Sequence, residues 1–303
     1  MQHRKYPFIV GFLIVPLALY AVFVISPFVQ AFHYSLTDWS GVSPEFEYVG
    51  LQNFKTLMDD SLFLEAIGNN AVILVGLPVL TILLALFYAY LLNVGGQGGR
   101  AGVTGVRGSG FYKLAFFLPQ MLSVPVIAVI WVAIFDPTPT GLANSLLRGL
   151  GLGDKGWLSD PNMALWCVLW VLVWLSVGFY LVLFNAAMSS IPRDIFEAAL
   201  MDGAGRFATF SRVTVPLLWD TIQTSWVYLA VLALDVYALV AVMTAGPGGP
   251  ANSTQVISLQ IAQNGFQFGR AGYASAMGVV LFFFTLSIAA IMLRATRRQR
   301  IEY

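Results

Sequence analysis

Hydrophobic residues along the 303-residue chain gather in six long runs, and polar or charged residues occupy the gaps between these runs. The runs are roughly residues 7–32, 67–92, 111–135, 163–188, 219–243 and 271–293. Each run has at least about 20 residues, which is enough for an α-helix to cross a hydrocarbon core about 30 Å thick. A membrane barrel would instead show alternating segments of about ten residues, which this pattern lacks. The pattern therefore predicts an all-α integral membrane protein with six transmembrane helices.

Composition agrees with this prediction, because hydrophobic residues make up 58% of the chain and charged residues only 10%. A soluble surface would not tolerate so apolar a chain. Cys167 is the one cysteine, and His3 and His33 are the two histidines, so neither a disulfide nor a metal-binding spacing can be built. Paired carboxylates, histidine clusters and base-activated nucleophiles are also missing from the sequence pattern, so we expect no catalytic residues, no metal site and no enzyme activity.

The distribution of lysine and arginine predicts the orientation of the helices. Bases in the segments that share a side with the N-terminus account for 12 of the 16 in the chain. These twelve are Arg4, Lys5, Arg100, Arg107, Lys113, Arg193, Arg206, Arg212, Arg294, Arg297, Arg298 and Arg300. The other four are Lys55, Arg148, Lys155 and Arg270. Because cytoplasmic loops carry the excess of positive charge, we expect both termini in the cytoplasm.

The N-terminal part has two features of its own. Residues 29–31 imitate a signal-peptide cleavage site, but the apolar stretch before them is about 22 residues long, against roughly 7 to 15 in a signal peptide, which predicts a retained anchor. Residues 33–66 hold six acids, one lysine and several aromatic side chains. This composition favours a small folded cap on the outer side.

Residues 93–110, NVGGQGGRAGVTGVRGSG, are glycine-rich and basic. A phosphate-binding loop needs a Gly-Lys-Ser/Thr ending after a strand, and this segment has neither. We interpret it as a flexible cytoplasmic turn.

Residues 191–218, IPRDIFEAALMDGAGRFATFSRVTVPLL, place charged side chains between two apolar runs. Pro192 suits a first helical turn, Asp194 suits the positive end of the helix dipole and Gly203 suits the exit, so we predict a short helix over residues 192–202. Phe196, Ala199, Leu200 and Gly203 form an apolar stripe on this helix. A second short segment over residues 206–214 is expected to end before Pro216. The whole segment 191–218 either lies on lipid headgroups or forms a protein interface.

The same segment carries a spaced motif. Glu197-Ala198-Ala199, then Gly203, then Val213-Thr214-Val215-Pro216 stand at the intervals of E-A-A-x3-G-x9-I-x-L-P. This spacing resembles the EAA signature of ABC importer permeases, and Val213 and Val215 replace the usual Ile and Leu conservatively. Other segments are similar to the carbohydrate-uptake branch of these permeases, namely YVGLQNF at 48–54, FFLPQ at 116–120, IW at 130–131 and MTAGPGGP at 243–250. The final residues, RATRRQRIEY, differ from the Gly-Ala ending of the second permease type, which favours the first permease subunit of a maltose-type system.

The resemblance implies a domain plan and a set of contacts. It implies an anchor helix and extracytoplasmic segment at 1–66, a type I ABC importer transmembrane domain at 67–293 and a basic cytoplasmic tail at 294–303. Residues 191–218 would then be the coupling helix that docks in a cytoplasmic ATPase. The residues expected to contact the ATPase are Glu197, Ala198, Ala199, Asp202, Gly203 and Pro216.

The resemblance also implies the partners. They are a second homologous permease, an ATPase dimer that binds ATP and Mg²⁺, an extracytoplasmic sugar-binding protein or lipoprotein, the sugar itself and the lipid of a bacterial cytoplasmic membrane. We expect no cofactor on this chain and no nucleic-acid partner.

The sugar pathway is expected to involve the fifth run, where Asp235 is the one ionisable residue deep within a run. A lipid-facing charge there would cost on the order of 2.5 to 3.5 kcal/mol, so Asp235 should face protein or water. Thr224, Tyr228 and Asp235 lie within about 40° of one another on a helical wheel, and Tyr237 follows them. Asp235 either contacts sugar or pairs with a base such as Arg270.

In the fourth run, Trp170 and Trp174 belong to a tryptophan series with a four-residue spacing. These rings either stack on sugar or pack against lipid and neighbouring helices.

Two other functions remain open at this level. An ion-coupled secondary transporter would need ionisable groups buried in its helices, and Asp235 is the single candidate. An ABC permease for a peptide, amino acid or oxyanion would share the coupling motif and differ only in cargo.

Overall fold

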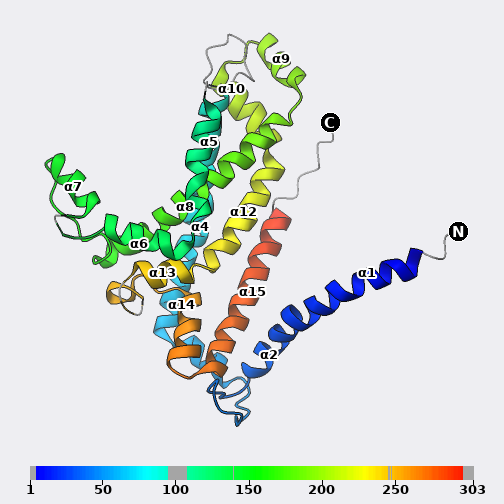
Figure 1. Ribbon diagram of the computed structural model, residues 1–303, viewed down its shortest axis with the longest axis vertical. Helices are drawn as coiled ribbons and strands as arrows, with labels where there is room; N and C mark the ends of the chain where they lie inside the picture. Colours follow the sequence, from blue (N-terminus) through cyan, green and yellow to red (C-terminus); the bar gives the residue numbers. More distant parts are fainter. Residues whose placement is uncertain (1–4, 95–107, 139, 245, 247, 296–303) are drawn as a thin grey trace. The chain divides into compact units, whose positions relative to one another are not determined.

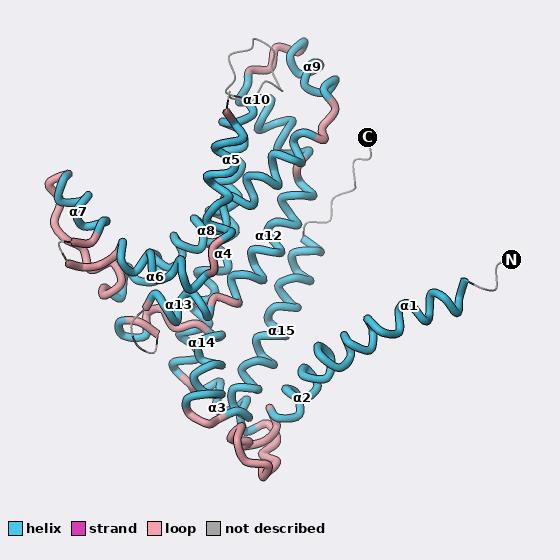
Figure 2. Tube along the Cα trace, in the orientation of Figure 1, coloured by secondary structure: helices cyan, strands magenta, loops and turns pink. Residues whose placement is uncertain are grey.

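The computed structural model of the chain describes residues 5–94, 108–138, 140–244, 246 and 248–295. Helices make up the regular structure of these residues, beside one isolated antiparallel bridge between Thr37 and Tyr48. Figure 2 shows the resulting helical trace with its connecting loops. The all-α prediction is confirmed. Most of the glycine-rich segment and of the basic tail, with Arg4, Arg100, Arg107, Arg297, Arg298 and Arg300, lies outside the described residues.

The chain divides into two compact units. The first unit holds the residues up to Leu64 together with Gln260–Phe284, and the second holds Glu65–Leu259 together with the residues from Thr285 onward.

The first unit begins with one long helical segment and continues into a folded cap. Its elements are α1 (Lys5–Tyr20), a π-helical turn (Ala21–Ile25), α2 (Ser26–Tyr34), α3 (Gln52–Asp59), a second π-helical turn (Gln263–Gln267) and the first half of α15 (Ala271–Ala295). In the cap, the ring of Tyr34 stacks on that of Trp39 with centroids 4.0 Å apart. The amide of Asn53 donates to the carbonyls of Ser35 at 2.9 Å and Thr37 at 2.8 Å. The segment after α2 is therefore folded, as its aromatic content predicts.

The second unit is built around α8. Its elements are α4 (Ser61–Val94), α5 (Ser109–Phe117), a 3₁₀ turn (Leu118–Met121), α6 (Val124–Ile134), α7 (Leu142–Gly149), α8 (Pro161–Ser189), α9 (Arg193–Met201), α10 (Arg206–Thr209), a π-helical turn (Phe210–Thr214), α11 (Val215–Leu217), α12 (Trp219–Leu234), α13 (Tyr237–Met243), a second 3₁₀ turn (Pro250–Asn252) and α14 (Ile257–Ala262). Most side chains of α8 are buried, including Val168, Leu172 and Leu181. Helices α5 and α12 both pack on α8 (Figure 1).

Four helical segments of the described chain are long and apolar enough to cross a membrane, and the number rises to six if each of two bent helix pairs forms one crossing. The four are Ile9–Tyr34, Ser61–Leu92, Pro161–Ser189 and Ala271–Met292. They match the first, second, fourth and sixth predicted runs.

The third predicted run is not one straight helix. The segments Ser109–Met121 and Val124–Ile134 meet at a bend of 102°. Pro119 lies in the 3₁₀ turn before the bend and Pro125 in the first turn of α6. Because proline has no N–H and clashes with the preceding turn, two prolines this close end one helix and start another.

The fifth predicted run is also wrong as a single helix from 219 to 243. Helix α12 ends at Leu234, Asp235 has φ −115° and ψ 64°, and α13 starts at Tyr237. At its other end, α12 meets the helical stretch Arg206–Leu217 at a bend of 68°. That stretch continues past Pro216, whereas the sequence predicted that it would end before this residue. The π-helical turn Phe210–Thr214 just before Pro216 already interrupts the regular hydrogen-bond ladder, so the missing proline N–H is tolerated.

Candidate functional site

Helix α9 carries the centre of the coupling motif, and it starts one residue later than predicted because Pro192 is its N-cap. Figure 1 shows α9 and α10 together at one end of the second unit, beyond the ends of α5, α8 and α12. Phe196 of α9 is buried, with 6% of its surface exposed. The side chains of Glu197 and Ala198 are exposed, so they are available to a partner.

The end of α9 explains the glycine of the motif. The N–H of Gly203 donates to the carbonyl of Leu200 at 2.9 Å, and the N–H of Ala204 donates to that of Ala199 at 2.9 Å. This pair of bonds is the Schellman ending, which needs a left-handed residue, and Gly203 has φ +75°. A Cβ at Gly203 would meet no atom within 4 Å. Within this chain, Gly203 is therefore required by backbone conformation and not by close packing.

The outer surface of the α9–α10 pair is partly apolar. Met201 is 88% exposed and Phe207 is 72% exposed, while Asp202 and Gly203 between them are also exposed. Leu200 is 39% exposed, so the predicted apolar stripe is buried only at Phe196 and partly at Ala199. Pro216 is exposed on α11. Large exposed apolar side chains rimmed by polar ones are typical of a protein interface.

The second candidate region is the break between α12 and α13. Asp235 is exposed there, and its backbone N–H donates to the carbonyl of Leu232 at 3.1 Å. Tyr237, at the start of α13, is 42% exposed. Asp235 is the C-cap of α12 and lies just beyond its last helical residue, so the helical wheel no longer fixes its side-chain direction relative to Thr224 and Tyr228.

Thr224 and Tyr228 do lie on one exposed face of α12, with Tyr228 68% exposed. The Thr224 hydroxyl donates to the backbone carbonyl of Asp220 at 2.8 Å, so its remaining capacity is that of an acceptor.

Trp170 and Trp174 belong to a different part of the second unit. They line a mainly apolar cavity of about 260 Å³ together with residues of α4 and α5, among them Tyr88 and Phe116. The ring of Trp174 also makes an edge contact with Trp131 of α6, with centroids 5.3 Å apart. Packing between helices therefore accounts for part of the surface of Trp174.

Two residues that the sequence analysis did not single out lie at the break. Asn70 of α4 is completely buried; its amide nitrogen donates to the carbonyl of Ala233 at 3.1 Å, and its amide oxygen accepts from the N–H of Ile257 at 2.9 Å. Asn69 donates to the carbonyl of Gln255 at 2.9 Å. The signal was available, because two adjacent amides inside an apolar run are costly unless they face protein.

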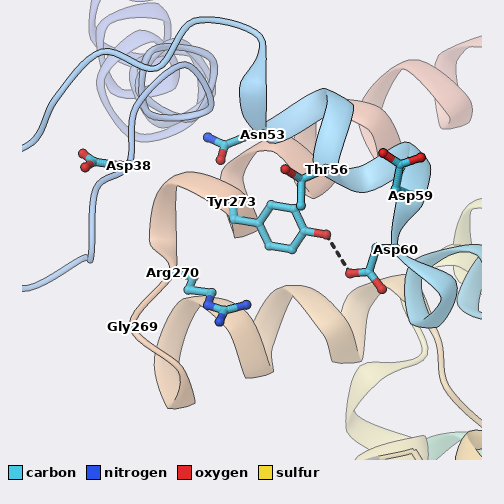
Figure 3. Close-up of a pocket in the computed structure, with 8 residues that line it drawn as sticks. All are labelled: Asp38, Asn53, Thr56, Asp59, Asp60, Gly269, Arg270 and Tyr273. Atoms are coloured by element: carbon cyan, nitrogen blue, oxygen red, sulfur yellow. Dashed lines mark hydrogen bonds between the residues drawn. The ribbon is translucent and has the colours of Figure 1, made fainter.

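The first unit has a polar cavity of its own, with a volume of about 490 Å³ (Figure 3). Its lining residues are Asp38, Asn53, Thr56, Asp59, Asp60, Gly269, Arg270 and Tyr273. Figure 3 shows Tyr273 pointing toward Asp60, to which its hydroxyl donates at 2.6 Å. Arg270, the predicted alternative partner of Asp235, is thus part of this cavity. Within the described ranges, no group of three metal-ligating side chains is placed to hold a metal ion.

These features define a class of protein. Apolar helices able to cross a membrane, breaks in two of the predicted spans and an exposed helix pair at one end of the second unit are typical of a membrane transport subunit. Residues 97–301 match the family described as the binding-protein-dependent transport system inner membrane component, and the chain belongs to that family. This family consists of transport permeases and not of enzymes.

The relatives are similar over nearly the whole chain. The diacetylchitobiose uptake system permease protein NgcF of Streptomyces coelicolor is 41% identical over 96% of this chain and 82% of its own. The multiple sugar-binding transport system permease protein MsmF of Streptococcus mutans is 31% identical over 95% of this chain and 94% of its own.

A solved structure shows the same fold. The similar chain belongs to a bacterial alginate ABC transporter in complex with an alginate pentasaccharide-bound periplasmic protein. It has a TM-score of 0.83 at 22% identity and covers 97% of this chain and 96% of that chain. The predicted type I ABC importer fold and the multi-pass membrane location are confirmed, and so is the assignment as an ABC permease.

Proposed function

We propose that this chain is the first-type permease of an ATP-driven sugar importer of a bacterial cytoplasmic membrane. The observation that carries the proposal is the α9–α10 pair, where the EAA spacing coincides with an exposed, glycine-terminated helix. The names of the relatives, which concern diacetylchitobiose and multiple sugars, support sugar as the cargo. A second homologous permease would complete the pathway, and an extracytoplasmic sugar-binding protein would deliver the sugar.

The geometry of the second unit supports a coupling step. An ATPase dimer that binds ATP and Mg²⁺ would receive Met201 and Phe207 in a surface cleft, while Phe196 stays buried within this chain. Movement of the docked pair would pass through the helical stretch Arg206–Leu217 into α12, which joins it at the 68° bend. Rigid-body motion of helices driven by a remote ligand is a common form of such switching. This chain would hold no cofactor itself.

The pathway would run past the break at Asp235. Interrupted helices inside a membrane are tolerated where the irregular backbone is buried in protein or lines a water-filled cavity, and transporters often place substrate there. Asp235 offers two acceptor oxygens for sugar hydroxyls, and Tyr228 and Tyr237 offer rings and hydroxyls. Trp170 and Trp174 are candidates for ring stacking. In this arrangement both termini lie in the cytoplasm and the cap of the first unit lies outside.

Co-purification with the ATPase tests the coupling role. Glu197→Lys reverses a charge that is exposed on α9, so we expect the complex to lose most of its ATPase subunit while the permease still inserts. Glu197→Gln, which keeps the size and removes only the charge, is the matched variant and should retain more ATPase. Full recovery of ATPase with Glu197→Lys would contradict the coupling role. Uptake of chitobiose-type and other sugars by the reconstituted importer, compared with amino acids and peptides, would test the cargo.

A further inference from the structure

The Asn70 side chain of α4 bonds to two helices that come much later in the sequence, α12 and α14. It donates to the carbonyl of Ala233, in the last turn of α12, and accepts from the N–H of Ile257, the first residue of α14. All three residues are buried, with exposed fractions of 0% for Asn70, 0% for Ala233 and 2% for Ile257. One amide therefore serves two backbone groups that have no access to water.

Neither backbone group has a partner within its own helix. In a continuous helix the carbonyl of Ala233 would accept from the N–H of residue 237, four positions later, but the chain leaves the helix at Asp235. The N–H of Ile257 belongs to the first turn of α14, where amides have no partner within the helix. Unpaired backbone groups are especially costly within a membrane, because no water replaces the missing bond.

We propose that Asn70 is a positioning residue that stabilises the break in the fifth span at Asp235. Its amide pairs with the carbonyl released by the break, so that residues 235–236 stay non-helical and present Asp235, with Tyr237 at the start of α13. Asn69, which donates to the carbonyl of Gln255, ties the chain before α14 to the same turn of α4. That these residues line the sugar pathway rests on the proposed function, whereas the hold on the break does not.

The chemistry of the two contacts selects an amide. The side chain must supply a donor on one side and an acceptor on the other, and both must reach backbone groups from a buried helix face. Leucine has a similar size and neither group. Serine has one hydroxyl and is too short to reach both backbone groups from the same position.

Cysteine labelling at the break tests this proposal without using transport. The chain contains one cysteine, Cys167, and it is buried, so the unmodified protein sets the background. The reporter is Tyr237→Cys in the full importer in nanodiscs, and the measurement is its rate of reaction with a charged methanethiosulfonate reagent. Adding Asn70→Leu should change this rate by roughly tenfold, because losing two buried hydrogen bonds is worth about that factor in an equilibrium. The rate rises if the segment opens to water and falls if the helix closes through Asp235.

Two controls separate positioning from general destabilisation. Thr81 also lies buried on α4, and its hydroxyl has no partner among the described residues, so Thr81→Val removes a polar group without touching the break. Trp166→Cys reports from α8, where the side chain is 59% exposed. Thr81→Val should leave labelling at 237 unchanged, and Asn70→Leu should leave labelling at 166 unchanged.

A labelling rate at 237 within about twofold of the parent in the Asn70→Leu protein would overturn the proposal, since it is less than one buried hydrogen bond predicts. If the leucine variant does not insert, Asn70→Ser takes its place with the same expectation. The measurement uses no sugar, ATP or uptake, so it does not depend on whether Asp235 contacts sugar. If the positioning role of Asn70 is contradicted, the permease assignment is unaffected.

Discussion

Gly203 shows how one residue can be required for two different reasons. Its φ of +75° is a reason within this chain, and docking against an ATPase is a proposed reason outside it. Asparagine tolerates the left-handed conformation better than other side chains do, and aspartate has nearly the same size with a charge added. Comparing these two substitutions therefore keeps size and backbone tolerance nearly constant and isolates the effect of charge.

We expect Gly203→Asn to keep most of the ATPase in the purified complex and most of the uptake. Gly203→Asp should lose both while still inserting, because an unpaired carboxylate buried at an interface costs at least several kcal/mol. Quantitative co-purification and uptake at matched permease levels give the comparison. Equal loss in the two variants would mean that the added side chain, and not its charge, causes the loss.

Gly178 has a packing role that backbone angles do not explain. A Cβ at this position of α8 would collide with the carbonyl oxygen and carbon of Phe116 in α5. Because the obstacle is backbone, it cannot swing away as a long side chain would. The two helices are therefore held at a distance that only glycine allows.

Gly178→Ala should lower stability by about 1 to 3 kcal/mol, the usual cost of overpacking a well-packed core. The measurement is the midpoint of thermal unfolding in detergent. Gly278→Ala on α15 is the matched control, because a Cβ there meets no atom within 4 Å and alanine favours a helix. If both variants melt at the same temperature as the parent, the close approach of α5 and α8 is not a constraint.

At the scale of elements, the sequence predicts uninterrupted helical segments well and breaks in helices poorly. The first, second, fourth and sixth runs match helices because a long apolar run is sufficient evidence for each. The bend near Met121 had a local signal in Pro119 and Pro125, which a reading by hydrophobicity alone passes over. The break at Asp235 had no such local signal. The residue that pairs with the carbonyl of Ala233 just before the break is Asn70, which lies 163 residues away from Ala233 in the sequence.

The candidate sites differ in the same way. The residues proposed for coupling stand in one short segment, where their spacing resembles the EAA signature, and the structure shows why Gly203 ends the helix. The residues proposed for the sugar pathway come from separate segments. The structure places Trp174 with α5 and α6, and Thr224 and Tyr228 on α12, while Asp235 stands in the break.

The break gives Asp235 a specific test. Asp235→Asn keeps size and hydrogen bonding and removes the charge, so sugar contact predicts altered uptake with an unchanged melting temperature. Pairing with Arg270 predicts instead a lowered melting temperature, which Arg270→Gln reproduces and the double variant does not lower further. Uptake and melting curves for the three variants distinguish the two roles. Unchanged uptake, selectivity and stability in Asp235→Ala would contradict both.

At the scale of the whole molecule, the exposed surface requires partners. The first span, Ile9–Tyr34, is strongly apolar, and none of its most apolar 18 residues is buried within this chain. In Pro161–Ser189, by contrast, 72% of the corresponding 18 residues are buried. An apolar surface of that length is covered either by lipid or by another subunit. The fourth span is therefore the core of the second unit, and the first span exposes its apolar side chains to lipid or to another subunit.

The topology depends on whether both bent helix pairs complete a crossing. If both do, Lys55 and Arg148 lie outside and Arg206 lies inside, as the distribution of bases predicts. Reporter fusions after these three residues should then give one signal at the first two positions and the opposite signal at the third. If the pair formed by Ser109–Met121 and Val124–Ile134 turned back at its 102° bend, the Arg148 fusion would report the inside and the Arg206 fusion the outside. That result would move α9 away from the ATPase side of the membrane, so the same three fusions also decide whether the coupling role is geometrically possible.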